Sequence, residues 1–419
     1  MADRRTFLKQ LGAGMLLAAP SLSTPLQAAA EQDSNESMGW KPHPLKQGDG
    51  RGGWIVRPAE YNLLHRRTGR YLFPYGLAVM DNGEIALSAA WHNGKSEDVS
   101  AWMPVMAFSR DTGRTWTDIQ EIEGGAGRPV LFTYLGKGNL TFQTDLVKPV
   151  MQYFSSDYGR TWPERRQLQL LSNGEPFNDE GNALVDRDAS GIATSIAQIG
   201  YYYEKDKKWP KDPAIGCLRW SSDGGRTWTK EDAPSIWRWQ ESHDGKTYTR
   251  GVSEGSLIRA KNGWLVAALR TDIPARYLEV RNEDSLEGTG ISISKDDGKT
   301  WSAVHVLYDA GRHHADLRRF PNGDLLMTLI VRDDVQNKEL ASYRRGCEAL
   351  ISRDNGLNWD VAHKYILDDY EFYDGKNWQN GECGHLCSAI LDDGSVLTTY
   401  GKYLTKGASL IRWKPAARS

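Results

Sequence analysis

An octapeptide that recurs five times constrains the fold more than any other feature of this 419-residue sequence. Its Asp can accept hydrogen bonds from the amides of its own turn, its Gly supplies a positive φ, and its Trp can anchor the turn on a sheet. Each copy follows an apolar stretch, which predicts a turn between two strands. The copies are SRDTGRTW (109–116), SSDYGRTW (155–162), SSDGGRTW (221–228), SKDDGKTW (294–301) and SRDNGLNW (352–359).

A second repeat, between the octapeptides, consists of two apolar strands joined by a turn that contains Gly. β-branched alternation around such turns predicts hairpins. Five of the six hairpins are followed by an octapeptide. We therefore expect an all-β fold, a six-bladed β-propeller with four-stranded antiparallel blades, closed by a strand near Trp54–Leu64. The hairpins span 77–90, 130–143, 183–196, 256–269, 317–330 and 388–400.

Composition narrows the function classes. The 52 basic and 54 acidic residues nearly cancel, so a general electrostatic grip on nucleic acid or an anionic membrane is not expected. The 16 tryptophans and 42 glycines favour an aromatic-rich β protein. Four cysteines in a chain of this length exclude a disulfide-dense scaffold, and Cys383 and Cys387 are expected either to pack or to form a local disulfide.

The first thirty residues have the layout of an export signal. A basic head precedes an apolar run from about Leu11 to Pro20, which is too short to span a bilayer, and Ala28-Ala29-Ala30 would suit a signal peptidase. The Arg4-Arg5 pair resembles a twin-arginine signal. We expect a periplasmic or secreted protein without stable membrane insertion, with a signal peptide at 1–30, a linker at 31–50 and the propeller at 51–419.

The Gly turn of each hairpin serves as a ruler for the inner strand, which lines the central channel in a propeller. Counting eight residues back from the residue before the Gly gives the expected start of each inner strand. Ionisable residues stand at or beside these starts, Arg128 and Glu180 among them, and apolar residues follow. We therefore expect charges at the mouth of a buried channel. The starts are Pro74, Pro129, Asn182, Glu254, His314 and His385.

The octapeptides between Gly-turn hairpins resemble the Asp-boxes of the sialidase superfamily, and the likeness covers nearly all of 51–419. This resemblance implies a propeller glycosidase. The stretch VSEGSLIRAKNG is similar to the one that carries the family's catalytic Glu, which implies that role for Glu254. The stretch WLVAALRTD is similar to one that ends in a carboxylate-binding Arg, here Arg270. A planar guanidinium suits a carboxylate, and Arg332 and Arg128 are further candidates for such a clamp.

The sequence also departs from the family pattern. Leu72 stands where the resemblance places a first Arg, and His385 stands where it places a nucleophilic Tyr. The family's acid/base Asp belongs in the loop after the first hairpin, where this chain offers His92, Glu97 and Asp98. Asp98 is our expected acid. The Asp-boxes themselves recur in propellers that are not enzymes, so the function has to be argued from the site.

Histidines gather at the expected ligand face, which leaves three kinds of site open. In the first, His385 or His314 acts as general acid or base opposite Glu254 or Asp98, as glycoside hydrolysis requires. The second is a metal site, but no metal-ligand spacing supports it, and we expect neither metal nor cofactor. The third is β-elimination from a uronic acid by a His or Tyr with an Arg on the carboxylate; Tyr71, Tyr75 and Tyr400 are the tyrosines near enough.

Three functions follow from these observations. The preferred one is a sialidase-like glycoside hydrolase that removes a terminal, acidic sugar from extracellular glycans. The second is a lyase acting on uronic acids, and the third is a glycan-binding propeller without catalysis. The expected catalytic residues are Glu254, His385, Asp98 and His314, and the expected substrate-binding residues are Arg270, Arg332, Arg128, His92 and Glu180.

Overall fold

The computed structural model describes residues 39–43, 59–64, 70–92, 102–145, 147–279, 283–372, 383–402 and 405–416. The expected signal peptide (1–30) and Asp98 lie outside these residues, as does most of the expected linker. The described residues form β-strands and short 3-10 helices. Among them there is no helix of the length and apolarity that crossing a membrane requires.

Three of the sheets have four antiparallel strands each, as the alternation around Gly turns predicts. The first contains β3 (Tyr71–Val79), β4 (Ile85–His92), β5 (Met103–Ser109) and β6 (Gln120–Glu121). The second contains β7 (Arg128–Gly136), β8 (Asn139–Asp145), β9 (Met151–Ser155) and β10 (Glu164–Gln167). The third contains β21 (Arg312–Arg319), β22 (Leu325–Val331), β25 (Arg344–Ser352) and β26 (Tyr365–Glu371).

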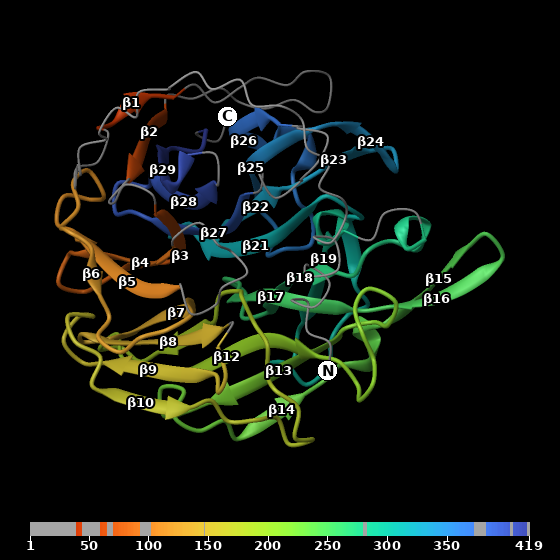
Figure 1. Cartoon of the computed structure of the whole chain (residues 1–419), viewed down its shortest axis with the longest axis horizontal. Coiled ribbons are helices and arrows are strands. Elements are labelled where there is room, and N and C mark those ends of the chain that lie inside the picture. Colours follow the sequence, from red (N-terminus) through yellow and green to blue (C-terminus); the bar gives the residue numbers. More distant parts are fainter. Residues whose placement is uncertain are drawn as a thin grey trace, which may run out of the picture.

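An eight-stranded sheet consists of two four-stranded halves that meet at one residue pair, Ile199 with Gly255. One half is β11 (Leu184–Arg187), β12 (Ala193–Tyr202), β13 (Ile215–Ser221) and β14 (Lys230–Asp232). The other is β17 (Val252–Arg259), β18 (Leu265–Thr271), β19 (Gly288–Ser294) and β20 (His305–Tyr308). Figure 1 shows the sheets around a common centre, with β3, β7, β17, β21 and β27 (Cys383–Ile390) innermost.

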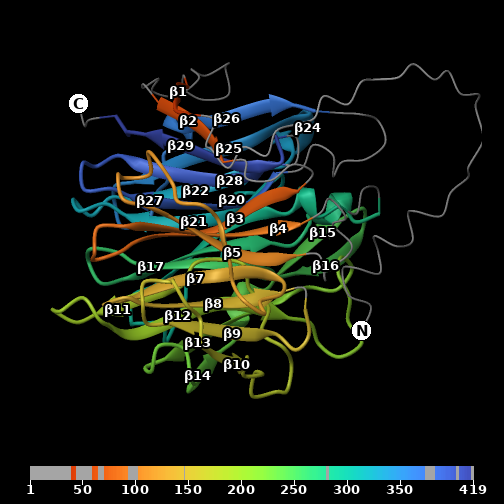
Figure 2. The same cartoon turned by 60° about the vertical axis from the view of Figure 1, so that its left-hand side comes forward.

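The last sheet joins the two ends of the described chain. Its order is β1 (Lys41–Pro42), β2 (Ala59–Leu64), β29 (Gly407–Trp413), β28 (Val396–Lys402) and β27. Figure 2 shows β1 and β2 beside β29. The prediction that a strand near Trp54–Leu64 closes the fold is therefore confirmed, and two residues of the expected linker add the short strand β1.

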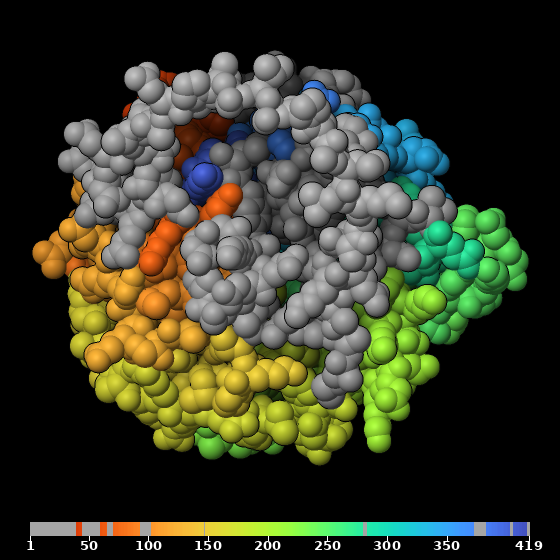
Figure 3. Space-filling view, viewed as in Figure 1, coloured from red at the N-terminus to blue at the C-terminus, as the bar shows by residue number. Residues whose placement is uncertain are grey.

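Two small hairpins and four 3-10 helices lie outside these sheets in the described part of the chain. Figures 1 and 3 show the hairpin β15 (Trp239–His243) and β16 (Lys246–Arg250) projecting from the rim. The second hairpin is β23 (Asp334–Gln336) and β24 (Glu339–Ser342). The helices are η2 (Ser235–Trp237), η3 (Ala275–Tyr277), η4 (Asp284–Leu286) and η5 (Val361–His363). Of these, η4 reaches the site described below.

Each octapeptide forms the self-contained turn that its residues predict. In the second copy, Thr161 donates from its amide and its hydroxyl to Asp157, at 2.9 and 2.6 Å. Ser155 Oγ donates to the same carboxylate and accepts from the amide of Gly159. The indole of Trp162 donates to the Gly159 carbonyl at 3.1 Å. In the fifth copy Asn358 replaces the Thr and donates its amide group to Asp354.

Five inner strands carry a β-bulge near their starting end, close to the positions that the ruler marks. An extra residue in a strand re-aims the side chains around it, and bulges are enriched beside active sites. His314 and His385 adopt left-handed backbone at φ 52° and 46°, which is uncommon for residues other than Gly. The bulges lie between Pro74 and Gly76, Val130 and Thr133, Val252 and Gly255, His313 and Asp316, and Gly384 and Leu386.

Candidate active site

A pocket lies at the centre, at the bulged ends of four inner strands. It encloses about 420 Å³, open solvent at its mouth included. Two glycines and an alanine leave space between its polar groups. Its lining consists of Tyr75, Glu180, Gly181, Asn182, Glu254, Gly255, His314, Ala315, His385 and Leu386. The bulges therefore bring residues from β3, β17, β21 and β27 into one concave surface with two carboxyl groups.

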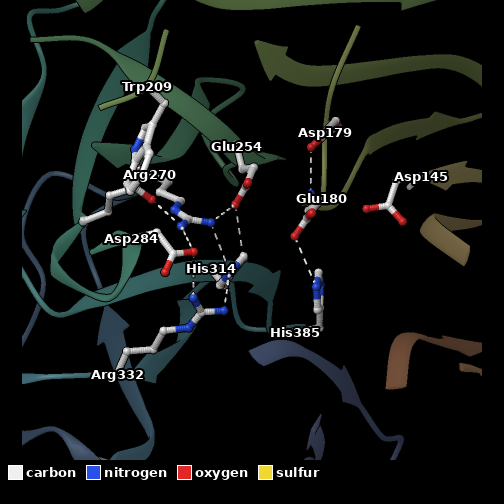
Figure 4. Close-up of polar contacts among 12 residues, drawn as sticks. Asp145, Asp179, Glu180, Trp209, Glu254, Arg270, Asp284, His314, Arg332 and His385 are labelled. Atoms are coloured by element: carbon white, nitrogen blue, oxygen red, sulfur yellow. Dashed lines mark hydrogen bonds and ion pairs between the residues drawn. The ribbon is translucent and has the colours of Figure 1, made fainter. Parts of the chain in front are cut away.

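Glu254, from the bulge of β17, is held by one cation and one histidine (Figure 4). The Nη1 of Arg270 donates to its Oε2 at 2.5 Å, and the Nδ1 of His314 lies 3.3 Å from the same oxygen. The Nε2 of His314 lies 3.2 Å from Arg270 and 3.4 Å from Arg332. Because a guanidinium only donates, this Nε2 must accept, and the ring proton sits on Nδ1, toward Glu254.

His314 is consequently a neutral hydrogen-bond donor. Burial first, and then the neighbouring Arg270, lowers its pKa well below the ordinary value for histidine. Protonating Nε2 would place a positive charge against two guanidinium groups. The acid/base role considered for His314 from its sequence position is thus disfavoured, and its contacts suit it to orienting Glu254 and stabilising its charge.

Glu180 lies in the segment before β11 and is held by Arg128 and His385. The Nη2 of Arg128 donates to Glu180 Oε1 at 2.5 Å, and the Nη1 of Arg128 lies 3.0 Å from His385 Nε2. That same His385 nitrogen is 3.2 Å from the second oxygen of Glu180. The ring of Tyr75 stacks obliquely on His385 at a centroid distance of 4.3 Å. Burial, and then Arg128, lowers the pKa of His385 well below its ordinary value.

Arg128 also binds Asp145, the last residue of β8, through Nε at 2.9 Å and through Nη2. Burial raises the pKa of Asp145 to about 7, the attraction of Arg128 opposes that rise, and the neighbouring Glu180 adds to it. Asp145 therefore keeps its proton up to about neutral pH, beside the Glu180 that shares Arg128 with it.

A second group of ion pairs lies behind Glu254 and His314. Asp284, on η4, bridges Arg332 at 3.1 Å and Arg270 at 3.4 Å through its Oδ2. Arg270 also pairs with the buried Glu287, which accepts from the indole of Trp209 at 2.8 Å. The guanidinium groups expected to clamp a substrate carboxylate are thus bound by carboxylates of the chain itself.

Other residues singled out in the sequence lie away from the pocket lining. His92 ends β4 and is buried against Trp102 and Tyr71, with centroid distances of 4.0 and 4.9 Å. Burial lowers its pKa to about 4. Tyr400 is buried and donates to Asp368. The four cysteines are buried free thiols, so Cys383 and Cys387 form no local disulfide.

Sequence reasoning missed Asp145, Asp284 and Glu287. Asp145 had a usable signal: it stands at the end of the second strand of its hairpin, as His92 and Arg270 do in theirs. Counting forward from the Gly turn as well as backward would have found it. Asp284 and Glu287 come from the connection between β18 and β19, which no repeat marks.

Three residues of the pocket have side chains of the kinds that bind metal ions. Glu180, His314 and His385 each place one ligand atom within 4.8 Å of the others. However, Arg128 is 3.0 Å from the His385 nitrogen, and Arg270 is 3.2 Å from the His314 nitrogen. A divalent cation there would be repelled by these guanidinium groups. The trio therefore fits a hydrogen-bonded site better than a metal centre.

Several solved structures share the fold. A protein of unknown function from Dyadobacter fermentans aligns with a TM-score of 0.61 at 19% identity, over 84% of this chain and 97% of its own. The α-L-arabinanase of Penicillium chrysogenum, complexed with arabinobiose, aligns with a TM-score of 0.51 at 13% identity, over 90% and 98%. A sialidase from Streptococcus pneumoniae aligns with a TM-score of 0.51 at 11% identity, over 89% and 71%.

At these identities the likeness concerns the fold. The search of curated protein sequences found no match. A family model does match: residues 86–402 fit the BNR repeat-like domain, a span that includes all five octapeptides and the pocket residues from Glu180 to His385. The chain therefore belongs to the BNR repeat-like domain family.

Proposed function

We propose that the protein is an exported glycoside hydrolase that removes a terminal sugar from extracellular glycans, on a six-bladed propeller. The observation that carries this proposal is the pocket itself, into which Glu180 and Glu254 both open. Glycoside hydrolysis needs a pair of carboxyl groups, one protonated and one ionised, on either side of the scissile bond. The two glutamates have different surroundings, and that difference assigns their roles.

Glu254 is the nucleophile or the base. Arg270 at 2.5 Å and the Nδ1–H of His314 at 3.3 Å both donate to its carboxyl group. It attacks the anomeric carbon or takes a proton from the attacking water. Either action needs a carboxylate, and both contacts also keep its side chain in one orientation.

Glu180 is the acid. It faces the pocket, and its proton comes from Asp145, whose pKa is raised to about 7 and which binds the same Arg128. It gives that proton to the glycosidic oxygen as the bond from the anomeric carbon breaks, so that the leaving group departs as an alcohol. Asp98, the acid expected from the sequence, lies outside the described residues. His385, 3.2 Å from Glu180, orients this acid.

One contact favours a second candidate, the uronic-acid lyase. Tyr75 and His385 are in ring contact in the pocket wall, at 4.3 Å, and His385 is neutral. A tyrosine beside a neutral imidazole can remove a proton and return one to the leaving oxygen. This pair distinguishes the two mechanisms, because hydrolysis depends on the glutamates and elimination on Tyr75.

The test is a turnover screen of the mature protein on aryl glycosides and oligosaccharides, with reducing ends and near-ultraviolet absorbance recorded together. We expect reducing ends without absorbance, and a loss of about 10³-fold in kcat for Glu254→Gln and Glu180→Gln. Tyr75→Phe should retain most of the activity. Glu279→Gln, an exposed glutamate on the rim, is the matched control.

Rising absorbance that Tyr75→Phe abolishes would establish the lyase instead. Sugar binding without turnover, unchanged in Glu254→Gln, would leave a glycan-binding propeller.

A further inference from the structure

The arginines beside the pocket are neutralised from within the chain. Among the described residues, Arg128, Arg270 and Arg332 pair with five carboxyl groups, those of Asp145, Glu180, Glu254, Asp284 and Glu287. Each of the three guanidinium groups is therefore already bound by at least one carboxyl group of the chain.

These ion pairs bear on the charge of the substrate. A substrate carboxylate brought to these arginines meets the carboxyl groups already bound there, and the repulsion between them is strong at low effective dielectric constant. A neutral sugar meets none of it. The positive charge that develops on the sugar ring in the transition state is instead favoured by the same carboxyl groups.

Asp284 binds both Arg270 and Arg332, in the place that a substrate carboxylate would otherwise take. One oxygen of Asp284 lies 3.1 Å from Arg332 and 3.4 Å from Arg270, so this side chain makes the contacts that an acidic sugar would need (Figure 4). Its side chain is 24% exposed, whereas that of Glu287 is 1% exposed. The side chain of Glu254, the third acid on Arg270, is 3% exposed, so Asp284 is the one of the three that solvent, and hence a ligand, can approach best.

We propose that the pocket selects a neutral terminal sugar, and that Asp284 is the residue that excludes a carboxylated one. This inference rests on the proposed hydrolysis for its substrate class, and it replaces the acidic sugar expected from the sequence. Asp284 acts on selectivity through Arg270 and Arg332 and takes no part in bond breaking.

The experiment uses sugar pairs that differ only at one carbon, such as an aryl galactoside and the corresponding galacturonide, extended to the best neutral sugar of the screen and its uronic analogue. We expect the wild-type protein to prefer the neutral member. Asp284→Asn should raise the acidic-to-neutral ratio of kcat/KM about tenfold, because it leaves the arginine pair one negative charge short. Asp309→Asn, which removes a rim partner of Arg276, is the matched control and should leave the ratio unchanged.

Two results would overturn the proposal: a wild-type preference for the acidic member, or equal losses on both members in Asp284→Asn, which would mean a merely structural role. If no sugar is turned over, the proposed hydrolysis fails, and calorimetric binding of galactose and galacturonate still tests the selectivity. Galacturonate binding that appears only in Asp284→Asn would support it, and galacturonate binding to the wild-type protein would refute it.

Discussion

Carboxyl groups on the rim and at the centre of this protein have different partners, and their pKa values shift in opposite directions. On the rim, each octapeptide Asp accepts hydrogen bonds from the Ser, from the Thr (Asn358 in the fifth copy) and from the amides of its own turn. These neutral donors, the Thr300 hydroxyl first among them, lower the pKa of Asp296 to about 2. In the centre, carboxylates are bound by arginines and histidines from other strands, and burial raises the pKa of Asp145 to about 7.

This contrast separates structure from chemistry. A rim turn depends on residues within eight positions, so it can be copied along the chain without regard to its neighbours. A central group depends on partners from several sheets, so each one differs. The bulge is the device that links the two regions, because it recurs on five inner strands while the residue it presents changes.

Among changes that leave both glutamates in place, the largest effect should come from removing His314, the neutral hydrogen-bond donor to Glu254. We expect His314→Ala to lower kcat about 10²-fold, because Glu254 loses a hydrogen bond and Ala is strained at φ 52°. His314→Asn, which tolerates left-handed backbone and keeps an amide donor, should lose less. The pH profile of both variants should keep the wild-type shape. A profile that loses a limb in His314→Ala would show that His314 titrates.

The next effect concerns the proton that Asp145 holds. Because the folded pKa of Asp145 is raised, the proton is held at low pH and lost as pH rises through about 7. We expect kcat/KM to fall above pH 7, and Asp145→Asn to move that fall to lower pH, because the group that holds the proton is gone. An unchanged pH profile in Asp145→Asn would show that this proton plays no part in the mechanism.

The raised pKa of Asp145 also makes the stability of the folded protein depend on pH. The native protein binds a proton at Asp145 that the unfolded chain releases above about pH 4. This contribution to stability is present at low pH and is lost between about pH 4 and 7. The midpoint temperature of thermal unfolding should therefore fall less steeply between pH 4 and 7 in Asp145→Asn than in the wild-type protein.

A rim substitution should affect stability alone. Asp157→Ala removes the acceptor of three hydrogen bonds and should lower the free energy of unfolding by about 1–2 kcal/mol, as the loss of a comparable cap does. Denaturant unfolding measures the change, and the exposed Asp118→Ala is the control. A matching fall in kcat for folded Asp157→Ala would break the separation of rim from centre.

The smallest effect is expected at the thiols. Burial raises the pKa of Cys217 to about 12, and Cys383 and Cys387 are buried behind the pocket wall. Ellman's reagent should therefore leave the native protein unlabelled and active, and should label all four cysteines after unfolding. Rapid labelling with loss of activity would place a thiol in the site.

Sequence patterns predicted the strands well because both repeats are local. The Gly ruler found the starts of the inner strands to within a few residues, and it placed Glu254, His314 and His385 at the bulges. In β3 the count gives Pro74, one position before the pocket residue Tyr75. Tyr75 is the extra residue of the bulge, which a count from the turn does not reveal. The Gly ruler could not show that Asp284 binds Arg332, because that contact joins η4 to the end of β22 and depends on how neighbouring sheets pack.

The pairing of β2 with β29 has a consequence for how the molecule forms. Leu64 pairs with Ala408, 344 positions later, so the ring of sheets cannot close before β29 has been synthesised. Until then β2 and β28 each present an unpaired edge. A contact so distant in sequence forms slowly and late in folding. A shortened β29 should therefore leave an open ring of sheets with two unpaired, aggregation-prone edges.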